Sequence, residues 1–158
     1  MYSKDHGATW TASKMAVDHV CEDQVVEVTP GVLMLNMRNH GSKDRTRKVY
    51  VSSDLGQTWT PHASNDILIE PVCHASVFKA GNTLLFANPA STTTRNMFTI
   101  KASDDLGVTW PRELLLDEEG GWGYSCMAMI DESTIGIVYE GSQSHIVFQA
   151  VKLADIKR

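Results

Sequence analysis

The chain has few cysteines, no long apolar run and no excess of basic residues. Its three cysteines, Cys21, Cys73 and Cys126, are far apart and form no C-x-x-C pair, which argues against a structural zinc site. No segment approaches the roughly 20 apolar residues of a membrane-spanning helix, and the first residues contain no apolar stretch typical of a signal peptide. With 14 Lys and Arg against 19 Asp and Glu, the chain lacks the basic surface that nucleic acid or an anionic membrane requires.

What the chain does contain is an octapeptide, S-x-D-x-G-x-T-W, that occurs three times. The copies are about 50 residues apart, and internal repeats of this length are typical of propellers, solenoids and related arrays. Within each copy the Asp can accept hydrogen bonds from backbone N–H groups, the Gly tolerates a positive φ, and the Ser and Thr hydroxyls can close the turn. We expect the Trp to pack each turn against apolar surface. The residues with these structural roles are Ser3, Asp5, Gly7, Trp10, Ser52, Asp54, Gly56, Trp59, Ser103, Asp105, Gly107 and Trp110.

Alternating apolar residues between the octapeptides predict an all-β chain built from four-stranded repeats. The predicted strands span residues 23–28, 32–37, 48–52, 75–78, 83–87, 97–102, 112–116, 125–130, 135–139 and 145–151, with a further short strand after Trp59. Each repeat then forms one propeller blade: a stub at 1–20, complete blades at 21–70 and 71–118, and a three-stranded last blade at 119–158. Because propellers close into a ring, we expect an N-terminal half or another copy to supply the missing blades.

The predicted topology brings five chemically distinctive residues to one face. In an up-and-down blade, the start of the first strand and the end of the second share a face, and the octapeptide turns lie on the opposite one. The shared face carries Glu22, Arg38, Arg95, Tyr124 and Glu140. Arginines bind carboxylates through charge-assisted hydrogen bonds, so this set suits a sugar that bears a carboxylate. A neutral tyrosine nucleophile is not repelled by that charge, and Glu22 is placed to take its proton.

The octapeptide resembles the Asp box, or BNR repeat, of sialidase-type propellers, and the segments around the five residues resemble those of bacterial exo-α-sialidases. The matching segments are residues 22–27, 35–39, 71–76, 86–89 with Arg95, 123–125 and 138–140. The resemblance implies the C-terminal portion of a six-bladed catalytic propeller. It also implies retaining hydrolysis of terminal sialic acid from glycoconjugates, without metal or cofactor, by a secreted or periplasmic protein.

The same resemblance implies a role for each of the five residues. Tyr124 corresponds to the nucleophile and Glu22 to its base. Arg38 and Arg95 correspond to the second and third arginines that bind the substrate carboxylate, and Glu140 to the glutamate that orients the first arginine. The motif that carries the first arginine, Phe/Tyr-Arg-Ile-Pro, and the segment that carries the aspartate acid are absent from the chain. We therefore expect the isolated chain to be inactive or weakly active.

Two other functions are open at this stage. The chain could be a non-catalytic sialoglycan-binding module, or a propeller fragment that associates with another copy of itself. The charged run at residues 43–47 and Glu70 are expected to be solvated loop charges. His74 lies at the predicted start of a first strand, and its sequence context assigns it no role.

Overall fold

The computed structural model describes residues 1–41 and 43–157. Its strands are β1 (Val20–Thr29), β2 (Val32–Asn39), β3 (Lys48–Ser52), β4 (Thr60–Pro61), β5 (Ser76–Ala80), β6 (Thr83–Pro89), β7 (Phe98–Ser103), β8 (Arg112–Asp117), β9 (Ser125–Asp131), β10 (Thr134–Glu140) and β11 (Ile146–Lys152). The only helical element in the described part of the chain is a 3₁₀ turn, η1 (Leu153–Asp155), so no helix there is long and apolar enough to cross a membrane. Ser42 and Arg158, which belong to the predicted blades 21–70 and 119–158, lie outside the described residues.

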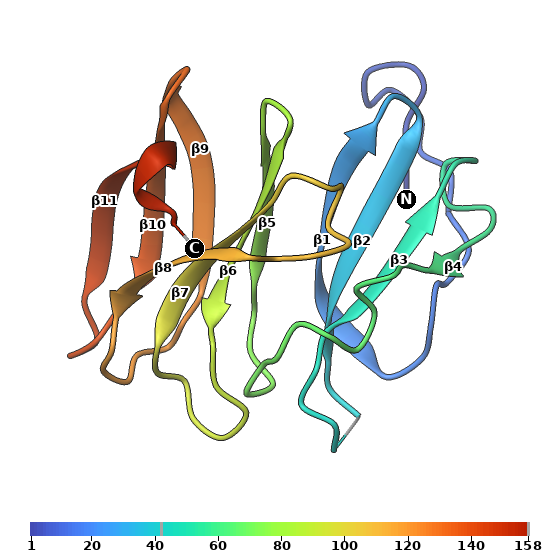
Figure 1. The fold of residues 1–158 in the computed structure, drawn as a ribbon. Helices are drawn as coiled ribbons and strands as arrows, with labels where there is room; N and C mark the ends of the chain where they lie inside the picture. The colour runs from blue at the N-terminus through green and yellow to red at the C-terminus, as the bar shows by residue number, and fades with distance from the viewer. Residues whose placement is uncertain (42, 158) are drawn as a thin grey trace.

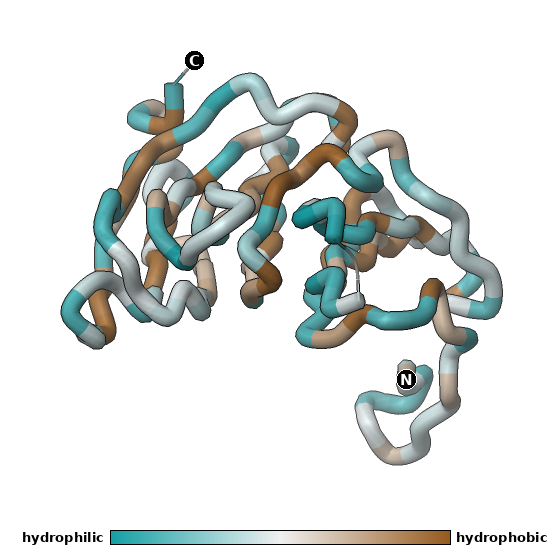
Figure 2. Tube along the Cα trace, turned by 90° about the horizontal axis from the view of Figure 1, so that it is seen from below, coloured by the Kyte–Doolittle hydropathy of each residue, from teal (hydrophilic) through white to brown (hydrophobic). Residues whose placement is uncertain are grey.

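The strands form three antiparallel sheets, in the orders β1-β2-β3-β4, β5-β6-β7-β8 and β9-β10-β11. Figure 1 shows the sheets following one another across the molecule, and the first strands of neighbouring sheets, β1 with β5 and β5 with β9, contact each other. Seen from below in Figure 2, the trace follows an arc that does not close. This arrangement confirms the predicted all-β, partial propeller fold. The main shift in strand bounds is at β1, which begins three residues before the predicted strand.

Apolar side chains that alternate along the strands fill the spaces between the sheets. Between the second and third sheets, the Phe98 and Tyr139 rings stack with centroids 4.7 Å apart. Such a ring pair contributes about 0.5–1.5 kcal/mol beyond the burial of its area. Between the first and second sheets, Met34, Val49 and Leu84 are fully buried. These two cores hold each sheet against its neighbour and so determine how the first strands converge.

Apolar side chains are exposed on the outer faces at both ends of the arc. On the third sheet, Ile146 is 70% and Phe148 63% exposed, and on the first sheet Val25 is 58% exposed. A closed propeller covers such faces with the next blade, whereas an isolated sheet face of this kind favours association. Both outer faces are therefore suited to contact with further blades.

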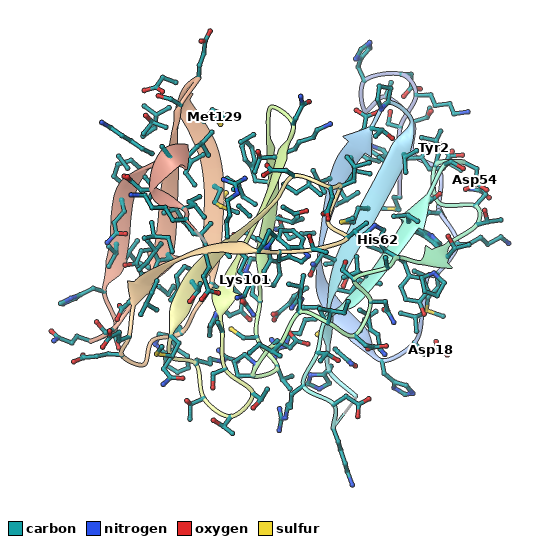
Figure 3. All side chains as sticks on the ribbon, viewed as in Figure 1. Tyr2, Asp18, Asp54, His62, Lys101 and Met129 are labelled. Carbon is teal, nitrogen blue, oxygen red and sulfur yellow. The ribbon has the colours of Figure 1, made fainter. Side chains whose placement is uncertain are left out.

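The three octapeptides form turns with nearly identical hydrogen bonds. In each, the Ser hydroxyl donates to the Asp carboxylate at 2.7–2.8 Å and the Thr hydroxyl donates to it at 2.5–2.6 Å. The residue before the Gly, which is His6, Leu55 or Leu106, also has a positive φ of 55–61°, so the turn uses two left-handed residues in succession. Figure 3 shows Asp54 toward the upper end of the first sheet and Asp18, which precedes β1, toward its lower end. The octapeptide turns and the starts of the first strands are thus at opposite ends of the sheet.

The tryptophans of the octapeptides differ in their surroundings. Trp110 packs against Phe86 and lies between the core of the first and second sheets and a small cluster formed by Leu68, Ala75 and Phe86. Trp59 is half-buried and donates to the backbone carbonyl of Lys14 at 3.0 Å. Trp10 is 62% exposed and folds back onto its own turn, donating to the Gly7 carbonyl at 3.1 Å. The expected packing against apolar surface is wrong for Trp10, because the stub contains no sheet on which the ring could pack.

The hydrogen bonds within the octapeptides predict a loss of stability in acid. Bonds from the Thr side chain and backbone, and from the Ser hydroxyl, lower the pKa of each Asp from 3.8 to about 2. A lowered folded-state pKa gives stability that is complete above the ordinary pKa and is lost as the pH falls from about 4 to about 2. We expect the Tm, followed by circular dichroism, to fall across this window. In an Asp54→Asn/Asp105→Asn variant the Tm should start lower at pH 5 and fall less steeply, and parallel curves would contradict the prediction.

Candidate active site

Side chains from the first and third sheets meet where the first strands converge. Tyr124, just before β9, donates its hydroxyl to Glu22 Oε1 of β1 at 2.5 Å. Arg38 of β2 donates to Glu22 Oε2 at 2.6 Å, and its Nη1 also lies 3.4 Å from Tyr124 Oη. The Arg38 side chain is 12% exposed and that of Glu22 is 30% exposed. The structure thus brings three of the five predicted residues into direct contact in a partly buried site.

Glu22 reaches this contact from a bulge inside β1 rather than from a position ahead of the strand. Cys21 pairs with Arg38 and Gln24 pairs with Asn36, so two residues of β1 lie opposite one residue of β2. A bulge of this kind redirects a side chain, and Glu22 accordingly has a φ of 50°, which is uncommon for a residue other than glycine. The predicted strand at 23–28 placed Glu22 outside the sheet, because apolar alternation does not continue through a bulge.

Tyr124 is held by its own backbone and by Glu140. The Tyr124 N–H lies 3.4 Å from the Glu140 carboxylate, and the Glu140 N–H donates to the Tyr124 carbonyl at 2.9 Å. The preceding Gly123 has a φ of 80°, and a Cβ there would lie 2.5 Å from Cγ of Pro89. Glycine is therefore required at this position. Within the described residues, Glu140 contacts the Tyr124 segment rather than an arginine.

Arg95 lies beside the other residues rather than among them. It donates to the Trp122 carbonyl at 3.1 Å and toward the Val72 carbonyl at 3.5 Å. These carbonyls belong to the segments that lead into Tyr124 and His74. Arg95 thus ties these two segments together at the edge of the site, and the residue as a whole is half-buried.

His74, which was predicted at the start of a first strand but without a role, contacts the tyrosine ring. The two rings are nearly parallel, at 8°, with centroids 5.0 Å apart. The amide nitrogen of Gln24 lies 3.4 Å from His74 Nε2. Burial, with the positive charge of Arg47, lowers the pKa of His74. The ring facing Tyr124 is therefore neutral near pH 7. Its contact with Tyr124 becomes visible only in the folded chain, because residues 74 and 124 are in different repeats.

The electrostatics of the site keep the phenol protonated and the carboxylate ionised in the resting protein. The hydrogen bond to Glu22, together with burial and the negative charge of Glu22, raises the pKa of Tyr124. Burial alone would raise the pKa of Glu22, but hydrogen bonds from Tyr124 and Arg38 outweigh it, so that this pKa is lowered. Glu22 is thus ionised and ready to accept a proton. Arg38 is close enough to the phenol oxygen to stabilise the charge that develops when the proton leaves.

Two charges predicted to be solvated are instead completely buried. Arg47 and Glu70 are both 0% exposed and form an ion pair with Nη1 and Oε2 2.7 Å apart. The prediction was wrong because the segment after β2 folds back against the link between the first and second sheets. Thr46 forms a β-bridge with Ile69 of that link, and this places Arg47 beside it. Sequence alone could not have found this pair, since the two residues meet only through that link.

Metal-binding groups are not found in the described ranges, 1–41 and 43–157: no three His, Cys, Asp or Glu side chains there are grouped to hold an ion. The three cysteines are free; Cys73 is buried and Cys126 is exposed.

Known proteins of one kind resemble this chain over nearly its whole length. It is 50% identical, over 99% of its residues, to a sialidase from Bacteroides fragilis (strain YCH46), and 34% identical, over 89%, to a sialidase from Micromonospora viridifaciens. It spans 30% and 23% of the lengths of these two relatives. Among solved structures, Hadza microbial sialidase Hz136 matches with a TM-score of 0.91 and 52% identity, covering 98% of this chain and 32% of that one.

The family model described as the BNR repeat-like domain matches residues 1–139. That range includes all three octapeptides and the three residues in direct contact at the site, Glu22, Arg38 and Tyr124. The chain therefore belongs to the BNR repeat-like domain family, and its sheets form part of a sialidase-type propeller.

Proposed function

We propose that the chain is part of an exo-α-sialidase that hydrolyses terminal sialic acid from glycoconjugates with retention of configuration. The observation that carries this proposal is the 2.5 Å hydrogen bond from the Tyr124 hydroxyl to Glu22, with Arg38 beside both. A phenol bonded to an ionised carboxylate is an activated nucleophile. The sialidases among the relatives support the choice of substrate class.

In the proposed first step, the Tyr124 oxygen attacks the anomeric carbon while its proton passes to Glu22. The bond to the leaving alcohol breaks, and that alcohol takes a proton from an acid. In the second step, water attacks the same carbon and loses a proton to a base, while the bond to the Tyr124 oxygen breaks and that oxygen takes its proton back from Glu22. Two displacements at one carbon retain its configuration. Arg38 and Arg95 bind the carboxylate of the sugar throughout, and Glu140 supports the backbone of Tyr124.

The proposal requires groups beyond those described for this chain. The Asp carboxylates of the octapeptides lie at the opposite end of the sheets and are occupied by their own turns, so they are unsuitable as the acid. We propose that the rest of the ring, an N-terminal half or another copy, supplies the acid and a further arginine and covers the exposed outer faces. A secreted or periplasmic location, where sialylated glycans occur, completes the proposal.

Covalent trapping tests the proposed step directly. A fluorinated sialosyl fluoride should form an intermediate that hydrolyses slowly on the protein with the complete ring, and peptide mass spectrometry should locate it on Tyr124. Tyr139→Phe is a suitable control, because Tyr139 is buried against Phe98, and that variant should still be labelled. An adduct on Glu22, or hydrolysis with inversion of configuration, would contradict the proposed nucleophile.

A further inference from the structure

Arg47 and Glu70 form hydrogen bonds to three other residues in addition to their own ion pair. Arg47 donates from Nε to the Asn36 side chain at 2.7 Å, and from Nη1 to the Cys73 carbonyl at 2.7 Å as well as to Glu70. The other Glu70 oxygen accepts from the Asn39 N–H at 2.6 Å. The pair therefore joins β2, the link between the first two sheets, and the segment ahead of β5.

One of these connections fixes the segment that carries Arg38. Asn36 and Asn39, which lie on either side of Arg38 in β2, are both bonded to the pair. Arg38 in turn contacts both Glu22 and the Tyr124 hydroxyl. The position of the guanidinium that faces the phenol thus depends on a strand end that the pair holds from both sides.

The second connection fixes the residue that stacks on the tyrosine. The carbonyl of Cys73 accepts from Arg47, and the next residue is His74, whose ring lies parallel to that of Tyr124. The link just before it is in a constrained conformation, because Val72 has a φ of 55°, a rare value for a β-branched residue. A strained conformation persists only where its surroundings hold it, and the bond from Arg47 to the Cys73 carbonyl is one such contact.

A buried ion pair is a costly means of stabilising a fold. Desolvation of two charges often cancels their attraction, and well-packed apolar residues serve stability equally well. What apolar residues cannot supply is a planar group with donors directed at three separate segments. The use of Arg47 and Glu70 at this place is better explained by the positions that they impose on their neighbours.

We propose that Arg47 and Glu70 are positioning residues for the candidate active site, which set Arg38 against the hydroxyl of Tyr124 and His74 against its ring. This inference rests on the proposed function for its catalytic consequence. The placement of the tyrosine itself does not depend on turnover and can be measured in the chain alone.

The test follows the titration of Tyr124 by NMR in protein labelled at tyrosine Cζ, with Tyr124→Phe used to assign the resonance. In the Arg47→Lys variant, which keeps the charge but loses the fork of donors, the pKa of Tyr124 should rise further, because the positive charge of Arg38, which lowers this pKa, is no longer held beside the hydroxyl. In the protein with the complete ring, kcat/KM for an α-sialoside should fall by about 10–100-fold, because small misplacements at a reacting centre have effects of this size. Asn36→Ala, which removes one acceptor of Arg47, serves as the second variant if Arg47→Lys does not fold.

Leu84→Ala is the matched control. Leu84 is buried in the core between the first and second sheets, and it pairs with Ser103, at the end of the sheets away from the candidate active site. This substitution should lower the Tm without changing the titration of Tyr124. If Arg47→Lys and Asn36→Ala lower the Tm like Leu84→Ala and leave the Tyr124 titration unchanged, the pair has only a structural role and the proposal fails. If the titration shifts but the complete protein has no sialidase activity, the positioning role stands and the proposed function is wrong.

Discussion

Replacing Tyr124 by Phe is expected to lower the turnover of a fluorogenic α-sialoside by about 10³-fold or more, because it removes the nucleophile and leaves Glu22 without a proton to accept. The assay requires the protein with the complete ring. Binding of the sugar should be nearly unchanged, since Arg38 and Arg95 keep their charges. The substitution removes a single oxygen atom from a half-buried residue, so its effect on the structure should be small.

Tyr139→Phe provides the matched control for this experiment. It removes the same hydroxyl from a tyrosine of the third sheet that packs in the core rather than the site. Its turnover should remain within a few-fold of the original protein. Should Tyr124→Phe keep full turnover, another group is the nucleophile. Sugar binding without turnover in the original protein would instead favour a non-catalytic sialoglycan-binding module.

Removing the partner of a buried charge should have the largest effect on stability. Glu70→Ala leaves the Arg47 guanidinium, which is 0% exposed, without its counter-ion and leaves the Asn39 N–H without its acceptor. Breaking a buried pair in this way costs about 3–5 kcal/mol of unfolding free energy. Urea denaturation followed by tryptophan fluorescence measures that loss.

A surface ion pair in the same chain supplies the comparison. Glu113 pairs with Lys101 across β7 and β8, and its side chain is 60% exposed. Glu113→Ala should therefore cost no more than about 1 kcal/mol. An Arg47→Met/Glu70→Leu double variant should recover part of the loss of Glu70→Ala, because no lone charge remains buried. Equal effects of Glu70→Ala and Glu113→Ala would show that the buried pair contributes little.

The features that could be predicted from sequence are those determined within a short segment. An octapeptide turn depends on its own Ser, Asp, Gly and Thr, and the strands between octapeptides follow from apolar alternation, so the propeller fold was predictable. The placement of Glu22, Arg38 and Tyr124 near one another was also predictable, because a repeat topology puts equivalent strand ends on one face.

The features that could not be predicted depend on segments that meet only in the folded chain. The bulge that turns Glu22 into the site interrupts the alternation on which the strand prediction relied. The burial of Arg47 and Glu70 depends on the path of a loop, and charged residues in a loop are exposed far more often than not. The start of a first strand was the correct place for His74, but its stacking on the Tyr124 ring depends on how the second and third sheets pack.

Glu22 and Tyr124 are provided by repeats that are not neighbours in the ring, with the sheet of β5–β8 between them. The repeats resemble one another as units of folding, yet none of them contains both the proton donor and its acceptor. A propeller that gains a blade by duplication therefore acquires another turn and another core without acquiring a second reaction centre. Repetition enlarges the scaffold, whereas the protein keeps one reaction centre. Its groups come from different blades and meet only while the blades keep their order.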